Sequence, residues 1–195
     1  MTEAIAVASP PAREGDWMIT YTGRRFWPLS PRPEDVSFLD IAHGLSNLCR
    51  YGGHTHCFYS VAEHSALLAM HFMAKGRADL ARYALLHDAS EAYVGDVIRP
   101  LKPQLARFKE IEAPIERAIL LAAGLAPEIP AEVHAADSAI IGEEARFLFR
   151  AETLEKADWV PLGRLAISDI MGWVPNYAEQ EWLILFEKLF PELTP

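Results

Sequence analysis

The side chains best suited to chemistry are His87, Asp88 and Glu91, which lie close together on one segment. An adjacent imidazole and carboxylate supply one nitrogen and one oxygen ligand, a pair that suits a divalent transition metal. Apolar residues recur at helical spacing before this pair, so we predict a helix over about 78–92 that presents all three side chains on one face. Because two protein ligands rarely hold a metal, further ligands should come from other segments.

Two other segments offer such ligands. Ser60 followed by Glu63 has the pattern of a capping box, which places His64 in the first turns of a helix. Asp137 is a lone acid in a helical stretch rich in alanine and isoleucine, where a carboxylate needs a partner. Spacing alone also fits two core histidines that are hydrogen-bonded to nearby acids. The metal-binding interpretation predicts one shared ligand set, which is His64, His87, Asp88 and Asp137.

In this order, the motifs resemble the HD-domain metal-dependent phosphohydrolases, and within them the branch that contains bacterial 5'-deoxynucleotidases. The resemblance covers roughly residues 40–140. That branch carries an Arg-aromatic pair, a Ser-Glu-His-Ser helix start, a His-Asp-Ala-Ser-Glu segment and a Gly-Asp pair. An isolated His-Asp pair would carry little weight, whereas the ordered set is specific. Here the motifs read Arg50-Tyr51, Ala62-Glu63-His64-Ser65, His87 to Glu91, and Gly95-Asp96.

The resemblance implies a role for each of these residues. Glu91 would orient and deprotonate the attacking water, and Arg50 would grip and stabilise the phosphoryl group with its guanidinium. Tyr51 stands where this branch typically has Trp and could stack on base or sugar. Asp96 would accept a hydrogen bond from a sugar hydroxyl. Lys102 and Arg99 form a cationic pair just past these motifs, where either could meet a phosphate.

Each residue also has a structural interpretation. Glu91 could be a solvated acid on a helix face, and Arg50 a cation that serves the C-terminal dipole of a helix. Asp96 follows a glycine, and Asp is ordinary in such a turn. Lys102 and Arg99 could lie in a solvated loop. These alternatives stay open at the level of the sequence.

The chain has two cysteines, Cys49 and Cys57, so a disulfide framework is not expected and the cytoplasm is the expected compartment. With His54 and His56 they could form a rival metal cluster. Their spacing lacks a half-site such as Cys-x-x-Cys, which argues against zinc there. Either histidine could instead line the mouth of the substrate site.

Composition sets further limits. The 195 residues suit one domain, and 51% hydrophobic with 23% charged residues is typical of a soluble globular protein. We expect no membrane span, since no stretch approaches the required run of about 20 apolar residues, and no signal peptide, since no basic region precedes the first apolar residues. A net charge of −9 argues against a nucleic-acid polymer as ligand, but a metal and one or two cations would suffice for a small phosphate ester.

Helical periodicity dominates the chain, so we predict an all-α fold, a single HD-type helical bundle over residues 16–195 after a flexible tail at 1–15. A short hairpin near residues 17–27 is an open alternative to coil, and Pro114 should kink or split its helix. The last helix has a broad apolar face, which we assign to the domain core or a homodimer surface. The predicted helices span about 34–49, 60–74, 78–92, 104–123, 131–154 and 177–189.

We therefore expect a metal-dependent phosphohydrolase that acts on a small nucleotide, a 5'-(deoxy)nucleoside monophosphate, to give nucleoside and phosphate. It would use one divalent ion (Mn, Co, Fe or Zn, with Mg as a further option), because His and Asp do not choose among these metals. The same residues would serve a deoxynucleoside triphosphate triphosphohydrolase that releases tripolyphosphate. Two other classes stay open, which are a nucleotide-binding or sensing protein without turnover and a helical interaction module.

Overall fold

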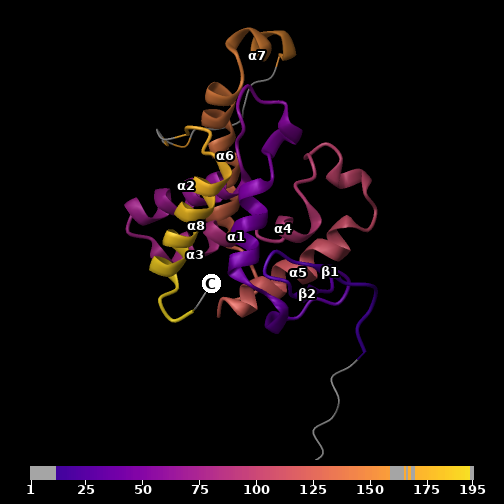
Figure 1. The fold of residues 1–195 in the computed structure, drawn as a ribbon. Helices are drawn as coiled ribbons and strands as arrows, with labels where there is room; N and C mark the ends of the chain where they lie inside the picture. The colour runs from indigo at the N-terminus through magenta and orange to yellow at the C-terminus, as the bar shows by residue number, and fades with distance from the viewer. Residues whose placement is uncertain (1–11, 159–164, 166, 168–169, 194–195) are drawn as a thin grey trace, which may run out of the picture.

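The computed structural model describes residues 12–158, 165, 167 and 170–193. Within this part of the chain the protein is mostly helical, with one two-stranded antiparallel sheet near the N-terminus (Figure 1). The predicted all-α class and the short hairpin are therefore confirmed. None of the described helices is long and apolar enough to cross a membrane.

In chain order, the elements are β1 (Met18–Ile19), β2 (Arg25–Phe26), η1 (Pro33–Asp35), α1 (Phe38–Asn47), η2 (Arg50–Gly53), α2 (Val61–Ala74), α3 (Ala78–Leu86), α4 (Glu91–Val94), η3 (Lys102–Gln104), α5 (Phe108–Ala122), α6 (Ala131–Leu148), α7 (Ala151–Ala157) and α8 (Pro175–Leu189).

Helix α2 lies at the centre of the bundle and contacts α1, α3, α6 and α8 (Figure 1). It is buried around its whole circumference from Val61 to Ala69, so its polar residues Glu63, His64 and Ser65 lie inside the core. The apolar face of α8 packs on α1, α2 and α3. Trp182 and Phe186 on that face are fully buried, so this face belongs to the domain core.

Serine caps set the first residues of the two N-terminal α-helices. The Ser60 side chain accepts a hydrogen bond from the Glu63 N–H, as the capping box predicts. The Ser37 side chain caps α1 in the same way, which corrects the predicted helix start near residue 34. Extended backbone at Val36 separates the short η1 turn from α1.

Three further helix boundaries differ from the prediction. The helix predicted over 78–92 ends at Leu86, because i→i+3 hydrogen bonds tighten the backbone over 87–90 before α4 begins. The predicted fourth helix begins later, at Phe108, and runs through Pro114 without being split. The predicted fifth helix is broken between α6 and α7 by two extended residues, Phe149 and Arg150.

The predicted N-terminal tail is partly anchored. Residues 1–11 lie outside the described part of the chain, but Arg13 donates hydrogen bonds to both carboxylate oxygens of Asp35, at 2.5 and 2.8 Å. Its guanidinium also lies 4.6 Å from the centre of the Trp27 ring. The segment between the last two predicted helices is described only at 155–158, 165, 167 and 170–176, and α8 begins at Pro175, two residues before the predicted start.

A buried carboxylate ties the segment before α8 to the start of α2. The Oε1 atom of Glu63 accepts hydrogen bonds from the backbone N–H groups of Met171 and Gly172, and Oε2 accepts one from Trp173. Gly172 has φ +69°, and a Cβ built there would lie 2.9 Å from the Phe58 carbonyl oxygen. The close approach of two backbone segments therefore requires glycine at this position.

We expect Gly172→Ala to destabilise the fold by about 2–4 kcal/mol, because a side chain in the left-handed region adds to a collision with backbone. Gly76→Ala is the matched control, since Gly76 has φ +70° but open space around a Cβ. That variant should lose only about 1 kcal/mol. Urea denaturation of both variants measures the difference, and equal losses would contradict the collision.

Candidate metal centre

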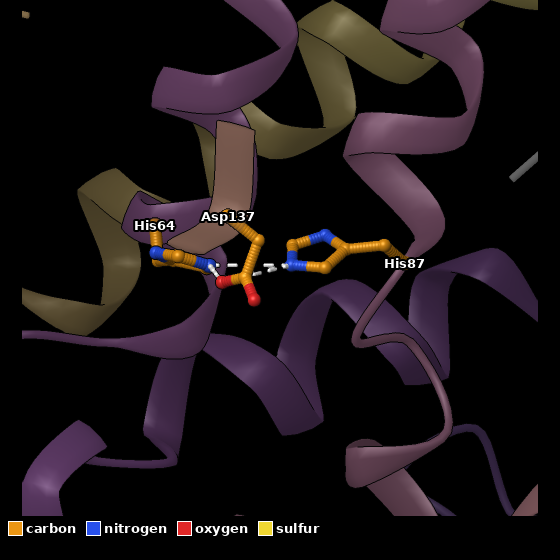
Figure 2. Close-up of side chains that lie close together, drawn as sticks. All are labelled: His64, His87 and Asp137. Carbon is orange, nitrogen blue, oxygen red and sulfur yellow. Dashed lines mark hydrogen bonds and ion pairs between the residues drawn. The ribbon is translucent and has the colours of Figure 1, made fainter. Parts of the chain in front are cut away.

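Side chains from α2, α6 and the turn after α3 meet inside the bundle (Figure 2). The Nε2 atom of His64 lies 3.2 Å from Nε2 of His87 and 3.2 Å from Oδ1 of Asp137. The His87 Nε2 atom lies 3.8 Å from the same Asp137 oxygen. Ligand atoms held at about 2.1 Å from one ion lie roughly 3–4 Å apart. The three side chains are therefore spaced as ligands of a common cation.

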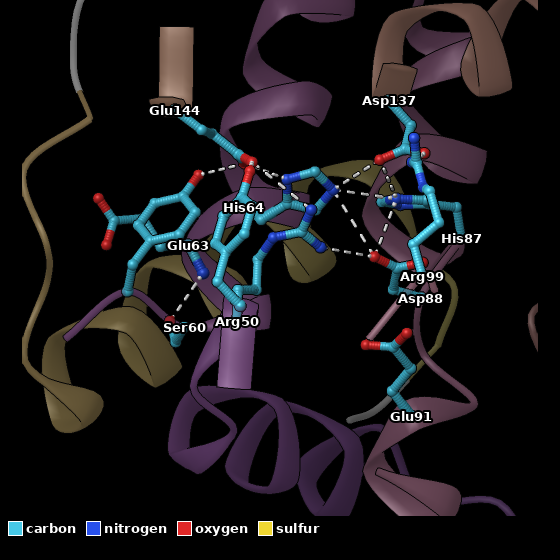
Figure 3. A network of polar contacts seen from close by, with 12 residues as sticks. Arg50, Ser60, Glu63, His64, His87, Asp88, Glu91, Arg99, Asp137 and Glu144 are labelled. Atoms are coloured by element: carbon cyan, nitrogen blue, oxygen red, sulfur yellow. Dashed lines mark hydrogen bonds and ion pairs between the residues drawn. The ribbon is translucent and has the colours of Figure 1, made fainter. Parts of the chain in front are cut away.

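Asp88, the fourth predicted ligand, lies against both imidazoles of this group. Its Oδ2 atom lies 3.2 Å from His87 Nε2 and 3.6 Å from His64 Nε2. Figure 3 shows Asp137 above and Asp88 below the His87 ring, with both carboxylates turned toward the two imidazoles. The structure thus brings His64, His87 and Asp137 together as one group and places Asp88 against both of its imidazoles.

The far side of each imidazole is occupied by an acceptor. His64 Nδ1 lies 2.6 Å from Glu144 Oε1, and His87 Nδ1 lies 2.8 Å from the Ala84 carbonyl oxygen. A carbonyl or carboxylate oxygen can only accept, so both Nδ1 atoms carry a hydrogen, and each Nε2 directs a lone pair at the centre once it is deprotonated. Four lone-pair atoms this close repel one another unless a cation or protons lie between them.

The carboxylates of Asp88 and Asp137 favour a positive charge between the two imidazoles. Burial alone would lower the pKa of His87, but Asp88 and Asp137 raise it well above the ordinary value for histidine. Burial alone would raise the pKa of Asp88 and of Asp137, but the histidines hold both values well below the usual range. The two carboxylates are therefore anionic over the physiological range.

Glu144, which the sequence analysis missed, supports the centre from behind. It is fully buried, accepts hydrogen bonds from the hydroxyls of Tyr51 and Tyr59, and lies 3.5 Å from Arg50 Nη2. Burial would raise the pKa of Glu144, but Arg50 and His64 outweigh it and lower the pKa to about 2. Its position in α6, two turns after Asp137 on the same face, is the sequence signal that could have identified it.

Arg50 bridges the metal ligands and this supporting acid (Figure 3). Its Nη1 atom donates to Asp88 Oδ2 at 3.3 Å. The next residue, Tyr51, has φ +58°, a strained conformation for a bulky side chain. The Tyr51 ring packs edge-on against Phe149, and its hydroxyl is bonded to Glu144. The use of Tyr51 as a stacking platform stays a prediction.

Glu91 and Lys102 form an ion pair beside the centre. Lys102 Nζ lies 3.2 Å from Glu91 Oε1 and 3.1 Å from Glu112 Oε1. Glu91 is almost fully buried, and its Oε2 atom has no hydrogen-bond partner among the described residues. Burial, helped by Asp88 and Asp96, raises the pKa of Glu91 to about 8. Such an acid is suited to take up a proton near neutral pH.

The remaining predicted residues lie at the edge of the site or away from it. Burial raises the pKa of Asp96, and the charges that act on it include Arg50, Asp88 and Lys102, which places it beside the same site. The rival cluster is not assembled, since the one metal-ligand group found within the described residues is His64 with His87 and Asp137. Both cysteines are free. His54 and His56 line a separate surface pocket of about 290 Å³ with residues 148–150 and 153.

Glu144→Gln should weaken the binding of Mn²⁺ or Zn²⁺ by about 10- to 100-fold, because an uncharged amide orients and polarises His64 less well. Glu143→Gln is the matched control, because Glu143 pairs with Arg146 and contacts no predicted ligand among the described residues. Isothermal titration of the metal into both variants checks this expectation. Equal affinities would remove Glu144 as a support of the centre.

Metal binding should strengthen as pH rises. The raised pKa of His87 keeps a proton on its ring that a cation must displace, so acid competes with the metal. We expect affinity to rise by up to about tenfold per pH unit while one proton is displaced. Calorimetry in buffers of different ionisation enthalpy would count the released protons, and an affinity that does not change with pH would argue against these ligands.

Two curated proteins are similar to this chain over about two thirds of its length. No model of a protein family matches the chain. "Uncharacterized protein YfdR" of Escherichia coli (strain K12) is 38% identical over 129 residues, which cover 66% of this chain and 70% of YfdR. "Uncharacterized protein RCAP_rcc00048" of Rhodobacter capsulatus is 37% identical over 136 residues, which cover 67% of this chain and 69% of that protein. The chain therefore belongs to the family that contains YfdR and RCAP_rcc00048.

Proposed function

We propose that the protein is a metal-dependent phosphohydrolase of the HD-domain type that converts small nucleotides, 5'-(deoxy)nucleoside monophosphates, into nucleoside and phosphate. The observation that carries this proposal is the convergence of His64, His87 and Asp137, with Asp88 against both imidazoles, next to a buried, partly unpartnered carboxylate, that of Glu91. A protein that only binds a nucleotide does not need such a carboxylate beside its metal.

The donor set fits a divalent ion. His64, His87, Asp88 and Asp137 would hold it through two neutral nitrogens and two anionic oxygens. When bound, such an ion supplies Lewis acidity toward a phosphoryl oxygen and a water molecule. Manganese, cobalt, iron and zinc all accept these ligands, and magnesium is a further option.

The protein's own side chains would perform the proton and charge transfers. Glu91 takes the proton from water as the new O–P bond forms, and its raised pKa lets it return that proton to the leaving 5'-oxygen as the ester bond breaks. Arg50 offsets charge on the phosphoryl oxygens. Asp96 accepts a hydrogen bond from a sugar hydroxyl, and Tyr51 with Lys102 borders the substrate.

Glu91→Gln should retain its metal and lower turnover by about 100-fold or more, because the amide cannot accept the proton of the water. Glu110→Gln is the control, since Glu110 is an exposed acid paired with Arg107 and should leave turnover unchanged. The assay is a panel of nucleoside mono- and triphosphates with each metal, in which nucleoside, phosphate and tripolyphosphate are quantified.

Three results would overturn parts of the proposal. Tripolyphosphate as product would replace the monophosphatase assignment by a triphosphohydrolase. Full activity in the Glu91→Gln variant would remove Glu91 as the proton acceptor. Tight nucleotide binding with no product at any metal would leave a binding or sensing protein.

A further inference from the structure

Three cationic side chains border the candidate metal centre, and they differ in how far neighbouring acids offset their charge. They are Arg50 from η2, Arg99 from the segment between α4 and η3, and Lys102 from η3. A cation whose charge is already offset by carboxylates attracts a substrate phosphate less than one that is free. Their ion pairs therefore indicate which of them has the most charge left to attract the substrate.

Arg50 and Lys102 are each held by two acids. Arg50 lies 3.3 Å from Asp88 Oδ2 and 3.5 Å from Glu144 Oε2, and its side chain is 12% exposed. Lys102 lies 3.2 Å from Glu91 and 3.1 Å from Glu112, and its side chain is 29% exposed. To reach a phosphate, Lys102 would have to release one or both carboxylates. Its contacts suit it to holding Glu91 in place.

Arg99 is held much more loosely. Its side chain is 69% exposed, and its Nη2 atom lies 3.8 Å from Asp137 Oδ2, beyond good hydrogen-bond distance. The other oxygen of that carboxylate, Oδ1, faces the two histidines. A divalent ion at the centre would draw on the charge of Asp137, which weakens its hold on Arg99 further.

The backbone around Arg99 approaches the turn that carries Arg50. A Cβ built at Gly52 would lie 3.6 Å from Ile98 Cγ2, so this segment approaches the η2 turn that carries Arg50. Figure 3 shows the Arg99 side chain with its guanidinium at Asp137, and 69% of that side chain is exposed. The guanidinium already lies next to a candidate metal ligand, so it can contact a phosphate at the centre without a change in the fold.

We infer that Arg99 is a substrate-binding residue. Its guanidinium moves away from Asp137 and pairs with a phosphate oxygen of the bound ester, and this contact selects for a phosphate dianion. The substrate class in this inference rests on the proposed function, but the phosphate contact does not require turnover. A guanidinium can form two parallel hydrogen bonds to phosphate, which are stronger than its single long contact to Asp137.

The test measures inorganic phosphate binding to the full-length, manganese-loaded protein by isothermal titration. Arg99→Gln should weaken phosphate binding by about tenfold while the manganese content stays that of the parent. Arg107→Gln is the charge-matched control, because Arg107 is 75% exposed and pairs with Glu110. It should change phosphate binding less than about twofold. With a nucleotide substrate, Arg99→Gln should raise KM with little change in kcat.

Four other binding results overturn the inference. Unchanged phosphate binding in Arg99→Gln, or no phosphate binding by the parent protein, removes the contact. An equal loss in Arg107→Gln assigns the effect to overall charge, and a loss of manganese in Arg99→Gln assigns Arg99 to support of Asp137. A parent that binds phosphate through Arg99 but hydrolyses no nucleotide would contradict the proposed function and leave this inference standing.

Discussion

The hydrogen bond from His64 Nδ1–H to Glu144 is the contact on which the candidate metal centre depends. Both residues are fully buried, so neither can be satisfied by water. A buried carboxylate is costly unless it is hydrogen-bonded and opposed by positive charge. Glu144 has two tyrosine hydroxyls and Arg50 around it, which keeps it anionic. The anion in turn orients the His64 lone pair toward the centre.

Arg50 links this support to the metal ligands. It lies between Glu144 and Asp88, so one guanidinium offsets an acid behind the centre and an acid within it. The same loop carries Tyr51 in a left-handed conformation, which costs about 1–2 kcal/mol for a non-glycine residue. The bond from Tyr51 to Glu144 and the packing against Phe149 compensate for that cost. The strained backbone of Tyr51 and the position of Glu144 in the site therefore depend on each other.

Burial of α2 also connects the site to the rest of the fold. Glu63 and His64 are neighbours, and both lie in the core with their polar atoms bonded. Glu63 holds the segment before α8 through three backbone N–H groups, while His64 faces the metal ligands. The start of one helix thus combines a structural anchor with a candidate ligand, and a change at either position should affect both.

Residue types and local spacing alone determined the all-α class and the Ser60 cap and singled out His64, His87 and Asp137, which the structure groups, because these depend on periodicity, capping chemistry and unusual polar residues in apolar stretches. Only the tertiary structure decided that the turn at 87–90 interrupts its helix, that Glu144 rather than Glu143 turns inward, and that Lys102 is held by Glu91 and Glu112. These outcomes depend on which elements pack together. A contact between residues far apart in the chain leaves no periodic signal in either segment.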